Sequence, residues 1–180
     1  MRFLAEDTAA LVVDYQERLV PAMHDAKELE QHSVTLLNGL EVLGIPIVIS
    51  QQYTKGIGMT IPAIFEAAGT EQYFDKMTFS CYDDEAIKVK IDGLGKNNII
   101  VCGIEAHVCV LQTCIDLKAA GYNVALVEDC ISSRKMHDKK MGLKRAAQEG
   151  VMITTYEAIL FEILRKAGKD VFKAISKLIK

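Results

Sequence analysis

The chain has 180 residues, 50% of them hydrophobic and 25% charged, a composition that suits one compact domain over residues 1–180. Its formal net charge is −3 and most lysines are scattered, so no basic face for a nucleic-acid partner is expected. No apolar run approaches the roughly 18 residues of a membrane span, and Glu6 and Asp7 interrupt any signal peptide, so we expect a cytoplasmic protein without a membrane partner.

Short β-branched runs alternate with stretches of helical period from one end of the chain to the other. The runs are TAALVVD (8–14), IPIVIS (45–50), NNIIVCGI (97–104), YNVALVED (122–129) and VMITT (151–155). The first long helical stretch covers residues 25–44, and Gly44, Gly121 and Gly150 each stand between a helix and the next run. The alternation predicts an α/β fold with a mostly parallel sheet covered by helices on both faces.

One long stretch, from Gln51 to Tyr73, has neither a strand period nor a helix period. It follows the second predicted strand, and loops at the carboxyl ends of parallel strands are where α/β sheets bind ligands. It is therefore a candidate wall of a pocket. Its glycines, Gly56 and Gly58, lack the GxGxxG spacing of a dinucleotide site and are interpreted as turn residues, so no nicotinamide or ATP cofactor is expected.

The five cysteines are an odd number without a CxxC pair, which favours free thiols in a reducing compartment. Cys102, Cys109 and Cys114 lack the ligand spacing of a zinc site, so no metal is expected. Cys102 lies inside an apolar run, where a thiol behaves as a small hydrophobe. Cys114 falls beside the apolar stripe of a helix predicted over residues 107–120, and packing is its expected role too.

Cys109 differs from the other cysteines because it falls in the first turn of that predicted helix. The apolar stripe of the helix is Val108, Leu111, Ile115 and Ala119. At helical spacing, Cys109 falls on the same side of the helix as Gln112, Thr113 and Asp116. This places Cys109 on the polar side, where unpaired backbone N–H groups favour a nucleophilic thiolate. A cysteine at a helix start by chance is the alternative.

A nucleophilic thiol needs a base and usually a cation. Asp14 closes the first predicted strand, where it could serve a site, although a turn or helix-cap role is the commoner one for such a residue. Lys76 lies in FDKMTFSCY, a segment with aromatic residues around one cation, and an ordinary surface lysine is the alternative.

Three segments, LVVDYQ, KMTFSCY and CGIEAHVCVLQT, resemble in order and spacing the motifs of the isochorismatase-like cysteine hydrolases. Further segments, ISQQYTKGIGMTIP, EDCISSR and FKAISKLIK, are similar to the branch of isochorismatase domain-containing proteins. The resemblance implies a three-layer α/β/α fold with a six-stranded sheet and a catalytic triad of Asp14, Lys76 and Cys109. It also implies a cis peptide bond between Ile104 and Glu105, with the backbone amides of Glu105 and Cys109 forming an oxyanion hole.

The implied activity is hydrolysis of a small molecule, most simply at a C–N amide bond. Nicotinamidases of the family carry Asp and His metal ligands after the second strand, whereas this chain reads ISQQYTKG there. Isochorismate-cleaving members often hold an acid in place of the cysteine, so vinyl-ether hydrolysis is an alternative that the thiol disfavours. Candidate substrate contacts are Gln16, Gln52, Tyr53 and His107, and each has a purely structural hydrogen-bonding role as its alternative.

A non-catalytic role on the same scaffold, as an oligomeric or redox-responsive interaction protein, is the other alternative. The C-terminal segment DVFKAISKLIK bears on assembly, because its apolar residues fall on one face at helical spacing. Those residues are Val171, Phe172, Ile175, Leu178 and Ile179. The stripe either docks on its own domain or forms a subunit interface, and we expect a homo-oligomer, at least a dimer.

Overall fold

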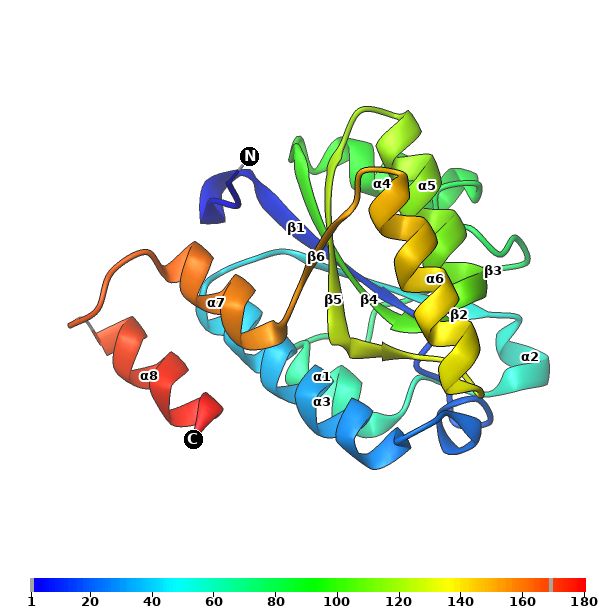
Figure 1. Cartoon of the computed structure of the whole chain (residues 1–180), viewed down its shortest axis with the longest axis horizontal. Helices are drawn as coiled ribbons and strands as arrows, with labels where there is room; N and C mark the ends of the chain where they lie inside the picture. Colours follow the sequence, from blue (N-terminus) through cyan, green and yellow to red (C-terminus); the bar gives the residue numbers. More distant parts are fainter. Residues whose placement is uncertain (1, 169) are drawn as a thin grey trace.

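The computed structural model describes residues 2–168 and 170–180, and its centre is a six-stranded sheet (Figure 1). The strand order is β3-β2-β1-β4-β5-β6, and every neighbouring pair is parallel. The strands are β1 Thr8–Val13, β2 Ile47–Gln52, β3 Phe74–Lys76, β4 Asn98–Ile104, β5 Asn123–Ser132 and β6 Met152–Thr154. The predicted α/β fold is confirmed.

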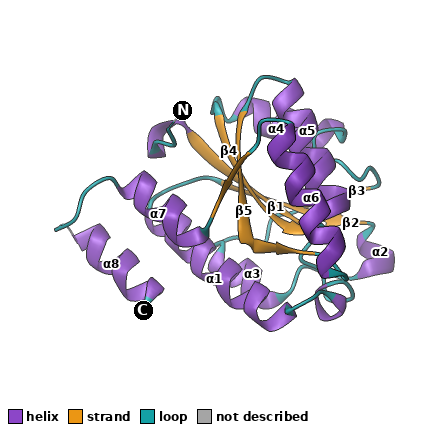
Figure 2. Ribbon diagram, viewed as in Figure 1, coloured by secondary structure: helices purple, strands orange, loops and turns teal. Residues whose placement is uncertain are grey.

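Helices cover both faces of this sheet, as the near-continuous apolar strands require (Figures 1 and 2). On one face lie α1 Ala26–Val42, α3 Pro62–Ala67, α7 Tyr156–Leu164 and α8 Asp170–Ile179. On the other lie α4 Glu85–Gly93, α5 Leu111–Ala119 and α6 Met136–Gln148. Shorter turns of helix are η1 Ala5–Asp7, η2 Val20–Ala22, α2 Thr54–Ile57 and the π-helical turn η3 Ala106–Val110.

Three elements, β3, α2 and α3, were not predicted from the sequence. The edge strand β3 has three residues, of which only Phe74 is apolar, so it carries no hydrophobic run. The stretch that was expected to be an irregular loop after the second strand begins instead as the end of β2 and contains the short helices α2 and α3. Gly58 ends α2 at φ +93°, as a turn glycine should, whereas Gly56 lies within the helix.

The central strands β1 and β4 are paired up to their carboxyl ends. Gly103 pairs with Val13 across the ladder and has φ +136°. A Cβ atom at Gly103 would lie 2.2 Å from the Val13 carbonyl oxygen, so a side chain there would force the two strands apart. Asp14 directly follows Val13, and η3 begins at Ala106, three residues after Gly103. The absence of a side chain at Gly103 therefore lets the ends of β1 and β4 lie close together, and these ends lead to the predicted base, Asp14, and the predicted nucleophile, Cys109.

The C-terminal helix α8 packs on α1 and α7 of its own chain, beside them in Figure 1. Ile175 is fully buried, and Leu178 and Ile179 pack against the same core, whereas Val171 is 39% exposed. Most of the predicted stripe is thus covered in cis, which accounts for its amphipathic pattern without a second subunit. Among the described residues, the helices include none with the length and apolar character to cross a bilayer.

Candidate active site

Polar side chains gather at the edge of the sheet where the central strands end. Asp14 follows β1, Gln52 and Lys76 are the last residues of β2 and β3, and Cys109 lies in η3 directly after β4. Parallel strands point their carboxyl ends to one edge, and this is where α/β sheets form their sites. Asp14 has φ +56°, a strained backbone that turns the chain sharply at the end of the strand.

Lys76 and Asp14 form a buried ion pair. The Lys76 Nζ lies 2.8 Å from Asp14 Oδ2, and both side chains are fully buried. The ammonium also donates to Gln52 Oε1 at 2.7 Å and to the backbone carbonyls of Thr78 and Phe79, each at 3.1 Å. Its three protons thus face four acceptors within the protein, so none is left to bind a substrate.

Burial is the largest influence on the pKa of Lys76 and lowers it, but the charge of Asp14 and the nearby thiols more than offset it. The pKa of Lys76 is raised in consequence, and the residue is a permanent cation beneath the site. A buried lysine of this kind is found almost only where it is paired.

The second carboxylate oxygen of Asp14 is held by a different strand. Ser50, in β2, donates its hydroxyl proton to Asp14 Oδ1 at 2.8 Å, and both residues are fully buried. Asp14 therefore has one oxygen fixed by Ser50 and the other by Lys76. With both oxygens oriented by neighbours, the carboxylate has a defined direction in which to accept another proton.

Cys109 is 7% exposed, and its Sγ lies 4.0 Å from Gln52 Oε1, the same oxygen that binds Lys76. The charges of Asp14 and Lys76 both act on the pKa of the thiol, so the three members of the predicted triad share one cluster. The arrangement brings together a thiol, a carboxylate and a cation.

The face on which Cys109 lies was predicted incorrectly. Cys109 and Thr113 are buried, while all four residues of the expected apolar stripe are only partly covered or exposed: Val108, Leu111, Ile115 and Ala119. The buried residues recur at helical spacing on a different face, so the covered face was assigned to the wrong residues; they are Cys109, Val110, Thr113, Cys114 and Leu117. Cys109 faces the interior of the site instead of the solvent-facing side of a regular helix. The predicted packing roles agree with the full burial of Cys102 and Cys114.

Burial raises the pKa of the Cys109 thiol well above its usual range, and the charge of Asp14 adds to this effect while Lys76 opposes it. The resting site therefore holds a protonated thiol beside an Asp14–Lys76 pair. This differs from the thiolate expected at a helix start, because the cation is already neutralised by the carboxylate. Deprotonation of Cys109 has to accompany its attack.

The peptide bond between Ile104 and Glu105 is cis, at the position that the family resemblance implies. The Glu105 carboxylate points away toward Arg134, whose Nε lies 3.1 Å from Oε2 and whose backbone N–H donates to Oε2 at 3.0 Å. The side chain of Glu105 is thereby committed outside the site. Only its backbone amide is a candidate for binding a substrate oxygen.

The four residues that were predicted to contact the substrate have different surroundings in the structure. Gln52 lies in the cluster, where it accepts from Lys76 and donates to the Met77 carbonyl at 3.1 Å. Gln16 is fully buried, and its amide bonds the backbone of Gln52 and of Gly58, so its structural role is the one observed. Tyr53 is 44% exposed. His107 is half-buried, with Nδ1 2.9 Å from Ser133 Oγ.

Sequence analysis missed Ser50 and Cys81. The signal for Ser50 was a single hydroxyl at the end of the apolar run IPIVIS, two residues before Gln52. Cys81 stands in KMTFSCY only five residues after Lys76, but it carries no sign in the sequence of which side chain it meets. Its Sγ lies 3.3 Å from Ser50 Oγ.

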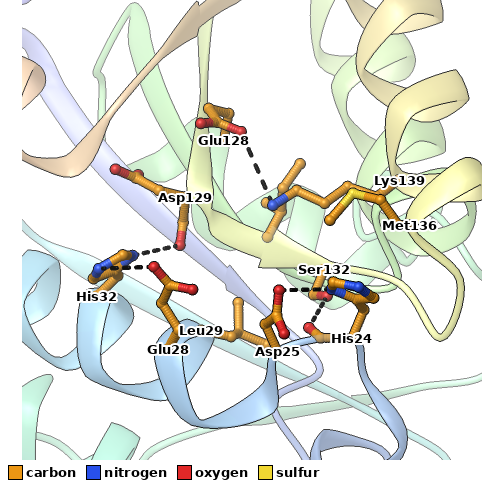
Figure 3. A pocket seen from close by; sticks show the side chains of 11 residues that line it. His24, Asp25, Glu28, Leu29, His32, Glu128, Asp129, Ser132, Met136 and Lys139 are labelled. Atoms are coloured by element: carbon orange, nitrogen blue, oxygen red, sulfur yellow. Dashed lines mark hydrogen bonds and ion pairs between the residues drawn. The ribbon is translucent and has the colours of Figure 1, made fainter.

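A separate pocket of about 190 Å³ lies between α1, β5 and α6 (Figure 3). Its charged side chains pair with one another: His24 with Asp25 at 2.8 Å and Lys139 with Glu128 at 3.9 Å. The residues that line this pocket do not include Asp14, Gln52, Lys76 or Cys109. Within residues 2–168 and 170–180, no group of three or more His, Cys, Asp or Glu side chains is arranged to hold a metal ion.

The geometry can be compared with known proteins. The isochorismatase domain matches residues 8–158, which span β1 to the start of α7. The match includes Asp14, Gln52, Lys76 and Cys109. The chain belongs to the isochorismatase family. Its fold is thus the hydrolase fold of that family, as the motifs indicated.

Two curated relatives show how far the isochorismatase likeness extends. The secreted isochorismatase effector Isc1 of Phytophthora sojae (strain P6497) is 34% identical over 183 residues, 99% of this chain and 87% of that protein. Isochorismatase domain-containing protein 1 of Salmo salar is 36% identical over 173 residues, which are 96% of this chain and 61% of the salmon protein. The chain therefore spans about three fifths of the salmon protein's length.

Solved structures with the isochorismatase fold are similar to this chain. A structure described as the MAR1 ribonuclease of Caenorhabditis elegans has a TM-score of 0.92 and 34% identity, covering 99% of this chain and 92% of that one. The YcaC gene product of Escherichia coli, described as an octameric hydrolase of unknown specificity, has a TM-score of 0.93 and 20% identity, covering 99% and 89%. The latter likeness is one of fold.

Proposed function

We propose that the protein hydrolyses a C–N amide bond of a small molecule, with Cys109 as nucleophile, Asp14 as base and Lys76 as the cation that holds Asp14. The observation that carries the proposal is the fully buried Asp14–Lys76 pair beside a partly accessible thiol. A buried pair whose surroundings perturb a neighbouring nucleophile is typical of active sites.

The reaction proceeds in two halves. Asp14 accepts the Cys109 proton as Sγ attacks the carbonyl carbon, and the backbone amides of Glu105 and Cys109 bind the oxyanion that forms. The C–N bond then breaks, Asp14 returns the proton to the leaving amine, and a thioester remains on Cys109. Water attacks that thioester, Asp14 takes the proton of the water, and the departing sulfur recovers it as the acid product leaves.

Lys76 acts in this scheme without touching the substrate. Its ammonium is shared among Asp14, Gln52 and two backbone carbonyls. It holds Asp14 in place, and Gln52 binds the same ammonium. Of the predicted substrate contacts, Tyr53 and His107 retain groups that can meet a ligand, whereas Gln16 is committed to the backbone.

The further properties proposed here are one hydrolase domain over residues 1–180, action without a metal, a homo-oligomeric state and a cytoplasmic location. The YcaC gene product is an octamer, which supports assembly by analogy of fold. Exposed apolar side chains near the site support it on this chain: Tyr53, Met59, Met77 and Phe79. The location remains a prediction of the sequence.

The proposal is tested by alkylation with iodoacetamide at pH 7, with each cysteine quantified by peptide mass spectrometry. Cys109 should react fastest, because Cys102 and Cys114 are fully buried and serve as internal controls. Asp14→Asn and Lys76→Ala should each slow Cys109, with folding verified by circular dichroism. Equal reactivity of all five cysteines would contradict a dedicated nucleophile.

A substrate panel then separates the chemical classes. It contains primary and secondary amides, a vinyl ether and a short RNA, each assayed with the native protein and with Cys109→Ala. Amide hydrolysis that disappears in Cys109→Ala supports the proposal. Cys109-dependent cleavage of the RNA or the vinyl ether would replace the substrate class, and a reactive Cys109 without turnover of any amide would favour the non-catalytic, redox-responsive alternative.

A further inference from the structure

Next to Ser50, the neighbour of Asp14, lies a second buried thiol that the mechanism does not use. The Cys81 Sγ lies 3.3 Å from Ser50 Oγ, which in turn lies 2.8 Å from Asp14 Oδ1. All three side chains are fully buried. The carboxylate of Asp14 is thus the end of a short hydrogen-bonded chain that begins at Cys81.

The direction of each proton in this chain follows from the groups themselves. An ionised carboxylate can only accept, so the single hydroxyl proton of Ser50 is donated to Asp14. The Ser50 oxygen is then left as an acceptor, and the S–H of Cys81 donates to it. Burial raises the pKa of Cys81 to about 11, so the thiol keeps its proton at neutral pH.

Cys81 is also tied to the element that carries the nucleophile. Its backbone N–H donates to Thr113 Oγ1 at 2.8 Å, and Thr113 lies four residues after Cys109 at the start of α5. Residues four apart lie on the same side of a helix. Cys81 therefore contacts the nucleophile's helix through its backbone and the base's neighbour through its side chain.

We propose that Ser50 and Cys81 are positioning residues for Asp14: Ser50 holds and orients the carboxylate, and the Cys81 thiol keeps the Ser50 hydroxyl pointed at it. The inference rests on the proposed function, in which Asp14 is the base. The groups that face Asp14 are Ser50 from β2, Lys76 from β3 and Cys109 from η3, with Cys81 behind Ser50.

A hydrogen bond donated to a carboxylate favours its ionised form, so removing it should make the base harder to ionise. The readout is the rate of Cys109 alkylation by iodoacetamide between pH 4 and pH 9. Any rise of this rate with pH that Asp14→Asn abolishes is assigned to the base. In Ser50→Ala this rise should move up by about one pH unit, slowing the reaction on the slope about tenfold, as one hydrogen bond to a charged group warrants.

Variants of Cys81 test the hydrogen bond from the Cys81 thiol to Ser50. Cys81→Ala should move the rise in the same direction with a smaller slowing of about threefold, because a thiol is a weak donor. Cys81→Ser keeps a donor at the same place and should restore the native profile. Cys114→Ala is the matched control, since Cys114 is equally buried but has no bond to Ser50 or Asp14, and its profile should not move.

An unshifted profile in folded Ser50→Ala overturns the inference, provided that Asp14→Asn abolishes the acid rise. If Asp14→Asn leaves the profile unchanged as well, the proposed function has failed at its base. Should Ser50→Ala fail to fold, the comparison of Cys81→Ala with Cys81→Ser decides alone: equal profiles for these two variants overturn the positioning role.

Discussion

Replacing Lys76 with methionine should be costly to the fold as well as to the site. The change keeps most of the side-chain volume but leaves the Asp14 carboxylate buried without its cation, 2.8 Å from where Nζ stood. At that distance and an effective dielectric constant of about 20, the attraction between the two charges is about 6 kcal/mol. Desolvation offsets part of it, and breaking a buried pair by removing one partner costs about 3–5 kcal/mol.

The assay is guanidinium unfolding at pH 7 of four proteins: native, Lys76→Met, Asp14→Asn and the double variant. Each single change should lower the free energy of unfolding by several kcal/mol. The double variant retains no buried charge at this pair, so its loss should fall short of the sum by about 2 kcal/mol or more. The slope against denaturant must stay constant for the comparison to hold.

A matched control is available on the surface of α8. Lys173 lies 3.3 Å from Asp170, but their side chains are 75% and 99% exposed. Lys173→Met should therefore change stability by less than about 0.5 kcal/mol. Losses at Lys76 and Asp14 that add to within about 0.5 kcal/mol would refute the reasoning, because the two charges would then be energetically independent.

Three further outcomes are expected. Gly142→Ala should slow alkylation of Cys109, since a Cβ there would lie 3.0 Å from backbone atoms of η3, while Gly93→Ala, with open space around it, serves as the unaffected control; equal rates in both would contradict this. Ile175→Ala should lower the free energy of unfolding by about 2–5 kcal/mol and Val171→Ala by less than about 1 kcal/mol, measured in urea; similar losses would argue against docking of α8 in cis. Any hydrolytic activity should survive dialysis against a chelator, and a loss that zinc reverses would show that a metal takes part.

The sequence predicted the strands that are buried on both faces, because such strands need mostly apolar residues. β1 and β4 are nearly all apolar, and β5 contains the apolar run 124–127, because helices cover both sides of them. β3 has no such run, since it lies at the sheet edge and is only three residues long. An ordinary surface lysine was the alternative for its last residue, Lys76, and the contacts of the ammonium with Asp14, Gln52 and two backbone carbonyls explain why it is buried.

The site itself was harder to predict because its partners are far apart in the chain. The polar residues at the strand ends could be named from their positions. The side of Cys109 could not, because this segment has apolar residues at helical spacing on two faces, and only its packing on the sheet shows which face is buried. The bond between Cys81 and Ser50 joins residues 31 positions apart, and no local pattern encodes it.

The full set of bonds around the Lys76 ammonium also limits how protons move. Lys76 has every proton engaged with Asp14, Gln52, Thr78 and Phe79, and Ser50 has its only proton engaged with Asp14. The proton that moves in the first half of the reaction is therefore that of Cys109, and in the second half it is one proton of the attacking water. Each half of the reaction is then a single-proton relay, so its rate in mixtures of light and heavy water should fall in a straight line with deuterium content.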